Sequence, residues 1–168
     1  MINFEIPDVV VGWDRGARQA AEAIAHRFGA TLNRIAVDRF ESTGETLARA
    51  TGPGGRQALV VATMRPNTSS RLVEILMVAR GLRDGGTALV DLFLPCLPYA
   101  RSDRPLGPSA PVGLEVFLSA LRSAGVSRVY TIDVHEPAAI AHLPWVISFD
   151  VNLILLDSLH RLLGKDGV

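Results

Sequence analysis

Two short polar clusters follow apolar runs and carry residue types that bind phosphate or metal. In "YARSDRP", Arg101 and Arg104 offer fork-shaped N–H donors that match phosphate oxygens, and Tyr99 adds a flat ring face. In "TIDVHEP", Asp133 and His135 stand two residues apart, which places both on one face of a strand. A carboxylate beside an imidazole could share a divalent cation, or it could orient the imidazole. The alternatives are a solvated charged loop for the first cluster and a turn-capping aspartate beside a packed histidine for the second.

A third polar stretch, "RFESTGET", combines an aromatic ring with hydrogen-bond acceptors. Phe40 is followed by Glu41, Thr43 and Glu45. The ring could stack on a nucleobase while the carboxylates accept hydrogen bonds from its amino group. The alternative is an ordinary turn before a weak hairpin.

The composition predicts one globular domain over residues 1–168. Hydrophobic residues make up 48% and charged residues 20% of the chain, and the formal net charge is +0. Without a basic excess, a general nucleic-acid surface is not expected. Nothing reaches the roughly 18 apolar residues of a membrane span, and "MINFEIPDVV" has no signal-peptide pattern. We therefore expect a cytoplasmic protein without a membrane partner, in which the single cysteine, Cys96, is a small core residue.

The order of apolar patterns predicts an α/β fold. Strands are expected at 9–12, 32–40, 57–64, 88–98, 127–135 and 145–150, and helices at 16–30, 67–86, 110–125, 136–143 and 152–164. The polar segment 41–55 reads as a loop or an irregular hairpin. This alternation predicts a parallel, doubly wound sheet of about five strands with helices on both faces. Ligands bind beyond the carboxyl ends of such strands, where both charged clusters are expected to lie.

Taken together, these motifs resemble the N-terminal half of ribose-phosphate diphosphokinase, also called phosphoribosyl diphosphate synthase. "RFESTGET" resembles the family's adenine-contacting loop. Residues 67–104 are similar to its Leu-rich helix, the following strand and a Pro-Tyr-Ala-Arg-Gln-Asp-Arg/Lys motif, and residues 110–135 resemble its Ala-Pro-Ile-Ser to Thr-Met-Asp-Leu-His run. The resemblance covers nearly the whole chain and implies a phosphoribosyltransferase-like half.

The resemblance also implies an activity and a set of site residues. Members of this family move the diphosphoryl group of ATP to the 1-hydroxyl of ribose 5-phosphate with Mg²⁺. His135, with Asp133, is expected to help hold that Mg²⁺, and Ser102 stands where the family has glutamine. Adenine contacts across a subunit boundary imply a homo-oligomer. The ATP-binding residues implied in this way are Phe40, Thr43, Glu45, Arg101, Ser102, Asp103 and Arg104.

Departures from the family pattern leave alternatives open. The loop after Arg104 reads "PLGPS" without lysines, the adenine loop has one extra residue, and "EPAAIAHL" replaces the family's glutamines after His135. The family's second domain, which carries most of the ribose 5-phosphate site, would begin near Val168, so this chain alone is expected to be inactive. Besides a diphosphokinase N-terminal half, two alternatives remain. One is a non-catalytic subunit that binds nucleotide or a true synthase, and the other is a stand-alone α/β domain with unrelated metal chemistry at Asp133 and His135.

Overall fold

A seven-stranded sheet organises the protein in a computed structural model that describes residues 6–12 and 16–162. The strand order is β3-β2-β1-β4-β5-β6-β7. The strands are β1 (Val9–Gly12), β2 (Thr31–Phe40), β3 (Glu45–Ala50), β4 (Gln57–Val61), β5 (Leu89–Leu94), β6 (Val126–Ile132) and β7 (Val146–Phe149). All neighbouring pairs are parallel except β2 and β3, which are antiparallel. The sheet has seven strands where about five were expected, and its parallel, doubly wound character is confirmed.

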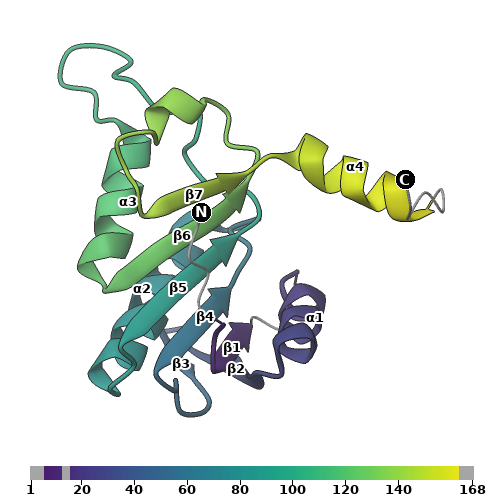
Figure 1. Ribbon diagram of the computed structural model, residues 1–168. Coiled ribbons are helices and arrows are strands. Elements are labelled where there is room, and N and C mark those ends of the chain that lie inside the picture. Colours follow the sequence, from purple (N-terminus) through teal and green to yellow (C-terminus); the bar gives the residue numbers. More distant parts are fainter. Residues whose placement is uncertain (1–5, 13–15, 163–168) are drawn as a thin grey trace.

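In the described part of the chain, four α-helices and one 3-10 turn connect or follow the strands (Figure 1). They are α1 (Arg18–Phe28), α2 (Thr68–Asp84), α3 (Gly113–Ser123), η1 (Pro137–Ala139) and α4 (Val151–Leu162). The chain passes from β1 to β2 in one direction along the sheet, and from β4 through β5 to β6 in the other. Because such crossovers are right-handed, α1 covers one face of the sheet and α2 and α3 cover the other. The predicted helix over 136–143 is reduced to the η1 turn.

The core lies between the central strands and the helices that cover them. Every residue of β4 is buried, and Leu92 and Leu94 of β5 are fully enclosed. Phe117 and Leu121 of α3 are equally buried. Burying one such side chain contributes roughly 1.5–3 kcal/mol, which explains why these strands read as continuous apolar runs.

The polar segment after β2 forms a regular hairpin. Its two strands pair from Ile35 opposite Ala50 to Phe40 opposite Glu45. In β3, Ala48 is buried while Leu47 is exposed, an alternation typical of a strand with one covered face. β3 packs against α2, so the hairpin is part of the domain and not a loose loop.

Helix α4 follows β7 and projects away from the sheet (Figure 1). Its large aliphatic side chains are exposed at Leu153, Ile154, Leu155, Leu156 and Leu159. Among residues 6–12 and 16–162, no helix has both the length and the apolar character needed to cross a bilayer.

Candidate functional site

The two charged clusters leave the sheet at neighbouring points. Strands β5 and β6 are paired up to Leu94 and Thr131. Immediately beyond them, the Ile132 N–H donates a hydrogen bond of 3.3 Å to the Pro95 carbonyl oxygen. The segments 95–104 and 133–136 therefore start side by side at the carboxyl edge of the sheet, where ligands bind in such folds.

The segment after β5 is anchored by apolar contacts and exposes its charged groups. Leu97 is buried, and the Tyr99 ring lies 5.8 Å from the Phe117 ring on α3. Tyr99 itself has φ 59°, a left-handed backbone conformation that is uncommon outside glycine. Arg101 and Arg104 are exposed at this edge. Both guanidinium groups are accessible to a phosphate-bearing ligand.

Cys96, in the same segment, is exposed, so its prediction as a core residue was wrong. The apolar run continues past Leu94, where the strand ends and the chain turns toward the surface. The composition of the apolar run does not indicate that the strand ends at Leu94.

Ser102 joins the arginine segment to the start of α3. The Gly113 N–H donates to the Ser102 hydroxyl at 3.1 Å, and the Leu114 N–H donates to the Ser102 carbonyl at 3.1 Å. A Cβ at position 113 would lie 2.8 Å from the Ser102 Oγ and 3.1 Å from a Tyr99 ring carbon. The hydroxyl that stands in the family's glutamine position is therefore already an acceptor for a helix N-terminus, although its O–H can still donate.

Asp133 and His135 lie beyond β6 and not on it. The strand ends at Ile132, and Asp133 has φ 51°. Because both residues stand in the turn, strand periodicity does not place them on a common face. Both are exposed, whereas Val134 between them is buried and its N–H donates to the Ser148 hydroxyl at 3.1 Å. The turn is thus fixed against β7 with its two polar side chains in solvent.

The fit of this turn to Mg²⁺ is partial. Within residues 6–12 and 16–162, no group of three or more His, Cys, Asp or Glu side chains is placed to hold a metal ion. Mg²⁺ keeps several waters and needs only one or two protein carboxylates when substrate phosphates supply further oxygens. The Asp133 carboxylate suits that role, and the His135 imidazole is a less typical Mg²⁺ ligand.

The third cluster converges at the end of the β2–β3 hairpin. Phe40 and Glu45 lie directly opposite each other in the register, and the Thr43 hydroxyl donates to the Glu45 carboxylate at 2.9 Å. Phe40 is 49% exposed, so part of its side chain is accessible to a ligand. The structure therefore brings together the three side chains expected to contact adenine.

The hairpin lies apart from the arginine segment. Strands β1 and β4 stand between β2 and β5, which makes three strand spacings or about 14 Å. The predicted adenine contacts and phosphate contacts therefore form two separate clusters within one copy of the chain.

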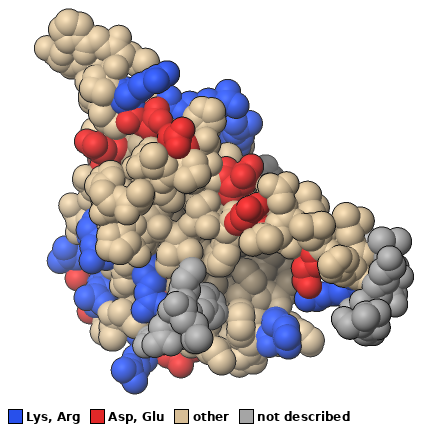
Figure 2. All heavy atoms as spheres, turned by 45° about the horizontal axis from the view of Figure 1, so that its top comes forward, with Lys and Arg blue, Asp and Glu red and all other residues tan. Residues whose placement is uncertain are grey.

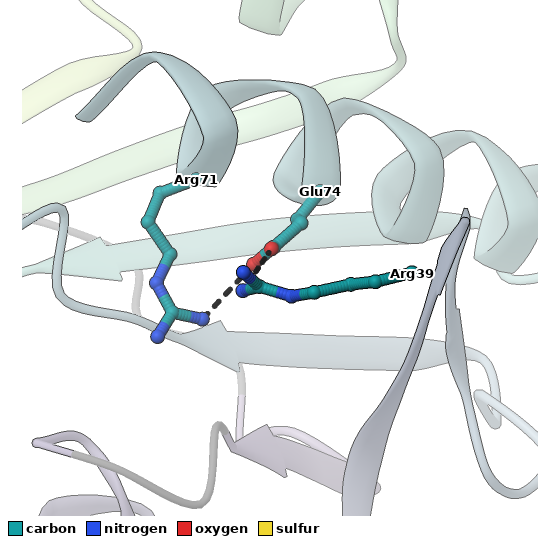
Figure 3. Close-up of polar contacts among 3 residues, drawn as sticks. All are labelled: Arg39, Arg71 and Glu74. Carbon is teal, nitrogen blue, oxygen red and sulfur yellow. Dashed lines mark hydrogen bonds and ion pairs between the residues drawn. The ribbon is translucent and has the colours of Figure 1, made fainter. Parts of the chain in front are cut away.

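An ion cluster around a buried glutamate ties the hairpin to α2, and the sequence analysis did not predict it (Figure 3). Glu74, on α2, is 0% exposed. Its carboxylate oxygens lie 2.9 Å from Arg71 Nη1 and 3.4 Å from Arg39 Nη2. The available signal was a glutamate inside the apolar run of a helix, three residues after an arginine. The Arg39 contact spans 35 residues, so sequence spacing gives no indication of it.

Two other surface features lie outside this arrangement. A hollow of about 500 Å³ between β3, the 52–54 turn and the C-terminal half of α2 is lined by Leu47, Met77 and Asp84 among others. It lies at the amino edge of the sheet, because α2 runs antiparallel to the strands that it connects. The second feature is the distribution of charge. On the face of the molecule drawn in Figure 2, acidic and basic side chains lie in small neighbouring groups, in keeping with the formal net charge of +0.

Comparison with known proteins adds a family relationship. A family model described as the N-terminal domain of ribose phosphate pyrophosphokinase matches residues 13–125. The ribose-phosphate pyrophosphokinase of Granulibacter bethesdensis is 29% identical over 118 residues, which are 70% of this chain and 38% of that protein. The one from Fusobacterium nucleatum is 27% identical over 135 residues, which are 80% of this chain and 42% of that protein. The matched segments thus cover less than half the length of these relatives.

A structural comparison shows the same fold. The crystal structure of phosphoribosylpyrophosphate synthetase from Mycobacterium smegmatis matches with a TM-score of 0.75 at 18% sequence identity. The match covers 92% of this chain and 52% of that chain. The matched family model covers more than half of this chain, and the family resemblance seen in the motifs is confirmed. This chain belongs to the family of the N-terminal domain of ribose phosphate pyrophosphokinase.

Proposed function

We propose that this chain is the Mg·ATP-binding half of a ribose-phosphate diphosphokinase. The reaction transfers the diphosphoryl group of ATP to the 1-hydroxyl of ribose 5-phosphate and gives phosphoribosyl diphosphate and AMP. The observation that carries the proposal is the adjacency of the two segments that leave β5 and β6, joined at Pro95 and Ile132. One segment offers arginines and the other offers an aspartate and a histidine.

The arginine segment is suited to the triphosphate. The Arg101 and Arg104 guanidinium groups present planar pairs of N–H donors that match phosphate oxygens. Ser102 and Asp103 lie between them, and the Ser102 O–H retains a donor beside its bond from Gly113. Transfer of this kind depends mainly on positioning and charge neutralisation, which arginines held at a sheet edge supply.

The turn after β6 is suited to the cation that accompanies ATP. Asp133 and His135 would hold Mg²⁺ together with phosphate oxygens and waters. When bound, the cation neutralises phosphate charge. The buried Val134 and its bond to Ser148 keep the Asp133 carboxylate and the His135 imidazole at the same sheet edge as Arg101.

The hairpin completes the nucleotide site from another copy of the chain. Phe40, Thr43 and Glu45 would contact the adenine, and a site shared between subunits is what the family resemblance implies. We therefore propose a cytoplasmic homo-oligomer. Ribose 5-phosphate would bind mostly to a second domain of the enzyme.

A second candidate is a non-catalytic subunit that binds nucleotide or associates with a true synthase. It is favoured by the Ser102 hydroxyl, which accepts the Gly113 N–H where the family has a longer glutamine. The loop "PLGPS", which lacks the family's lysines, points the same way.

Binding and turnover together separate these candidates. Isothermal titration of this chain with ATP and Mg²⁺ is expected to show binding under both candidates. Formation of phosphoribosyl diphosphate from ribose 5-phosphate, assayed with this chain combined with a second domain of the family, is expected under the first only. Nucleotide binding without turnover, with capture of a full-length synthase, would select the second. The absence of both Mg·ATP binding and capture of a full-length synthase, or metal-dependent hydrolysis of another substrate, would reject both.

A further inference from the structure

Glu74 is a carboxylate placed inside the domain, in the middle of α2. Its exposed fraction is 0%, and its helix neighbour Ile75 is also buried. A buried carboxylate is stable only when charged or hydrogen-bonding partners replace the water that it loses. Its partners therefore show what the residue does in the fold.

Two guanidinium groups contact the Glu74 carboxylate (Figure 3). Oε2 accepts a hydrogen bond of 2.9 Å from Nη1 of Arg71, which lies one turn earlier in the same helix. Oε1 accepts a hydrogen bond of 3.4 Å from Nη2 of Arg39, which lies on strand β2. The Arg71 side chain is 16% exposed and that of Arg39 is 62% exposed. The first pair lies within the helix, and the second reaches outward to the hairpin.

The Arg39 contact acts at the end of the hairpin. Arg39 immediately precedes Phe40 and pairs with Thr46 across the hairpin, while Phe40 pairs with Glu45. Farther along β3, Ala48 is buried on the side that packs on α2. The ion pair thus extends the attachment to α2 as far as the residue beside the predicted adenine contacts.

We propose that Glu74 is a positioning residue for nucleobase recognition. Through Arg39 it fixes the direction of the hairpin end, and with it the Phe40 ring and the Glu45 carboxylate. The proposal rests on the proposed function, because it assigns a role in nucleotide affinity to a residue that touches no nucleotide. We therefore expect loss of this contact to weaken binding of the nucleobase and to leave binding of the triphosphate unchanged.

Two probes separate the base from the phosphates. ATP carries both, and inorganic triphosphate carries the phosphates alone, so the ratio of their affinities reports on the base. Arg39→Met removes the outward ion pair and leaves the Arg71–Glu74 pair in place. We expect it to lower this ratio about two- to five-fold, the scale of a partly exposed ion pair. Arg39→Lys, which keeps the charge, is expected to restore most of the ratio. Glu74→Gln tests the carboxylate directly, provided that this variant folds.

Arg49→Met is the matched control. Arg49 is on the same hairpin and pairs with Asp38 across the two strands, with both side chains more than half exposed. This pair does not reach α2, so its loss should leave the ratio unchanged. A general effect of hairpin stability would instead lower the ratio in both variants, and that result would overturn the proposal. An unchanged ratio in Arg39→Met would also overturn it.

Hydrogen exchange distinguishes failure of this proposal from failure of the proposed function. Amides of residues 40–45 are expected to exchange faster in Arg39→Met and at the wild-type rate in Arg49→Met. If the wild-type protein binds neither probe, the proposed function fails and the role in base recognition fails with it. Faster exchange in Arg39→Met would then still support the attachment of the hairpin to α2. Unchanged exchange would refute that attachment, whether or not nucleotide binds.

Discussion

Replacing Ser102 by alanine tests whether its hydroxyl secures the first turn of α3. The hydroxyl accepts the Gly113 N–H at 3.1 Å, and that donor is one of those a helix leaves unpaired at its N-terminus. Loss of such an acceptor costs about 0.5–2 kcal/mol and typically about 1. The Leu114 N–H keeps its bond to the Ser102 carbonyl, so we expect a loss of about 1 kcal/mol.

The assay is urea or thermal unfolding of the folded protein. For a domain of this size, about 1 kcal/mol lowers the Tm by roughly 2–4 °C. Ser102→Thr retains the hydroxyl and should lose less than Ser102→Ala. Ser119→Ala, on the exposed side of α3, is the control and should stay within about 0.5 kcal/mol of the wild type. An unchanged Tm in Ser102→Ala would refute the reasoning, as would equal losses in the alanine and threonine variants.

Three further predictions concern packing and pH. Leu92→Ala, at a fully buried position, should cost about 2–5 kcal/mol in urea unfolding, whereas Leu155→Ala, at a residue 55% exposed, should cost less than about 0.5. Gly12→Ala should cost about 1–3 kcal/mol by the same assay, because its Cβ would lie 2.5 Å from the Cβ of Ala21. Burial raises the pKa of Tyr130 above its ordinary value of 10.0, since it disfavours the phenolate. The folded state thus holds this proton more tightly, and stability should decline as pH rises above about 10, a decline that Tyr130→Phe should reduce. A pH dependence identical in both proteins would contradict this.

The alternation of strands and helices could be predicted because buried parallel strands read as continuous apolar runs. The all-buried β4 and the enclosed leucines of β5 are the clearest cases. The hairpin was harder to predict, since β3 is a short edge strand with only Ala48 buried. Its pairing depends on β2 and on α2, which local composition does not report.

The ends of strands limited the prediction of the site. The apolar run of β5 continues to Leu97, so Cys96 was expected inside the core and is exposed. The same-face reading of Asp133 and His135 assumed that β6 continued, whereas it ends at Ile132 and Asp133 takes a positive φ. The adjacency of the two segments could still be predicted, because it depends only on strand order.

Long-range ion pairs could not be predicted from the sequence. Glu74 stands in an apolar helix pattern, and only the fold shows that Arg39 reaches it from β2. Likewise, the bond from Gly113 to Ser102 spans 11 residues, across a loop whose path the sequence does not specify.

Binding of Mg·ATP in a double-mutant cycle tests the central claim most directly. The cycle compares the wild type, Arg101→Ala, His135→Ala and the double variant by isothermal titration. Arg56→Ala, an exposed arginine before β4 at the amino edge, is the control. If both side chains serve one site, each single variant should lose affinity at least about ten-fold, or 1.4 kcal/mol. The double variant should then depart from additivity by at least about 0.5 kcal/mol. Wild-type affinity in either single variant, or a loss of the same size in Arg56→Ala, would contradict a shared Mg·ATP site at the ends of β5 and β6.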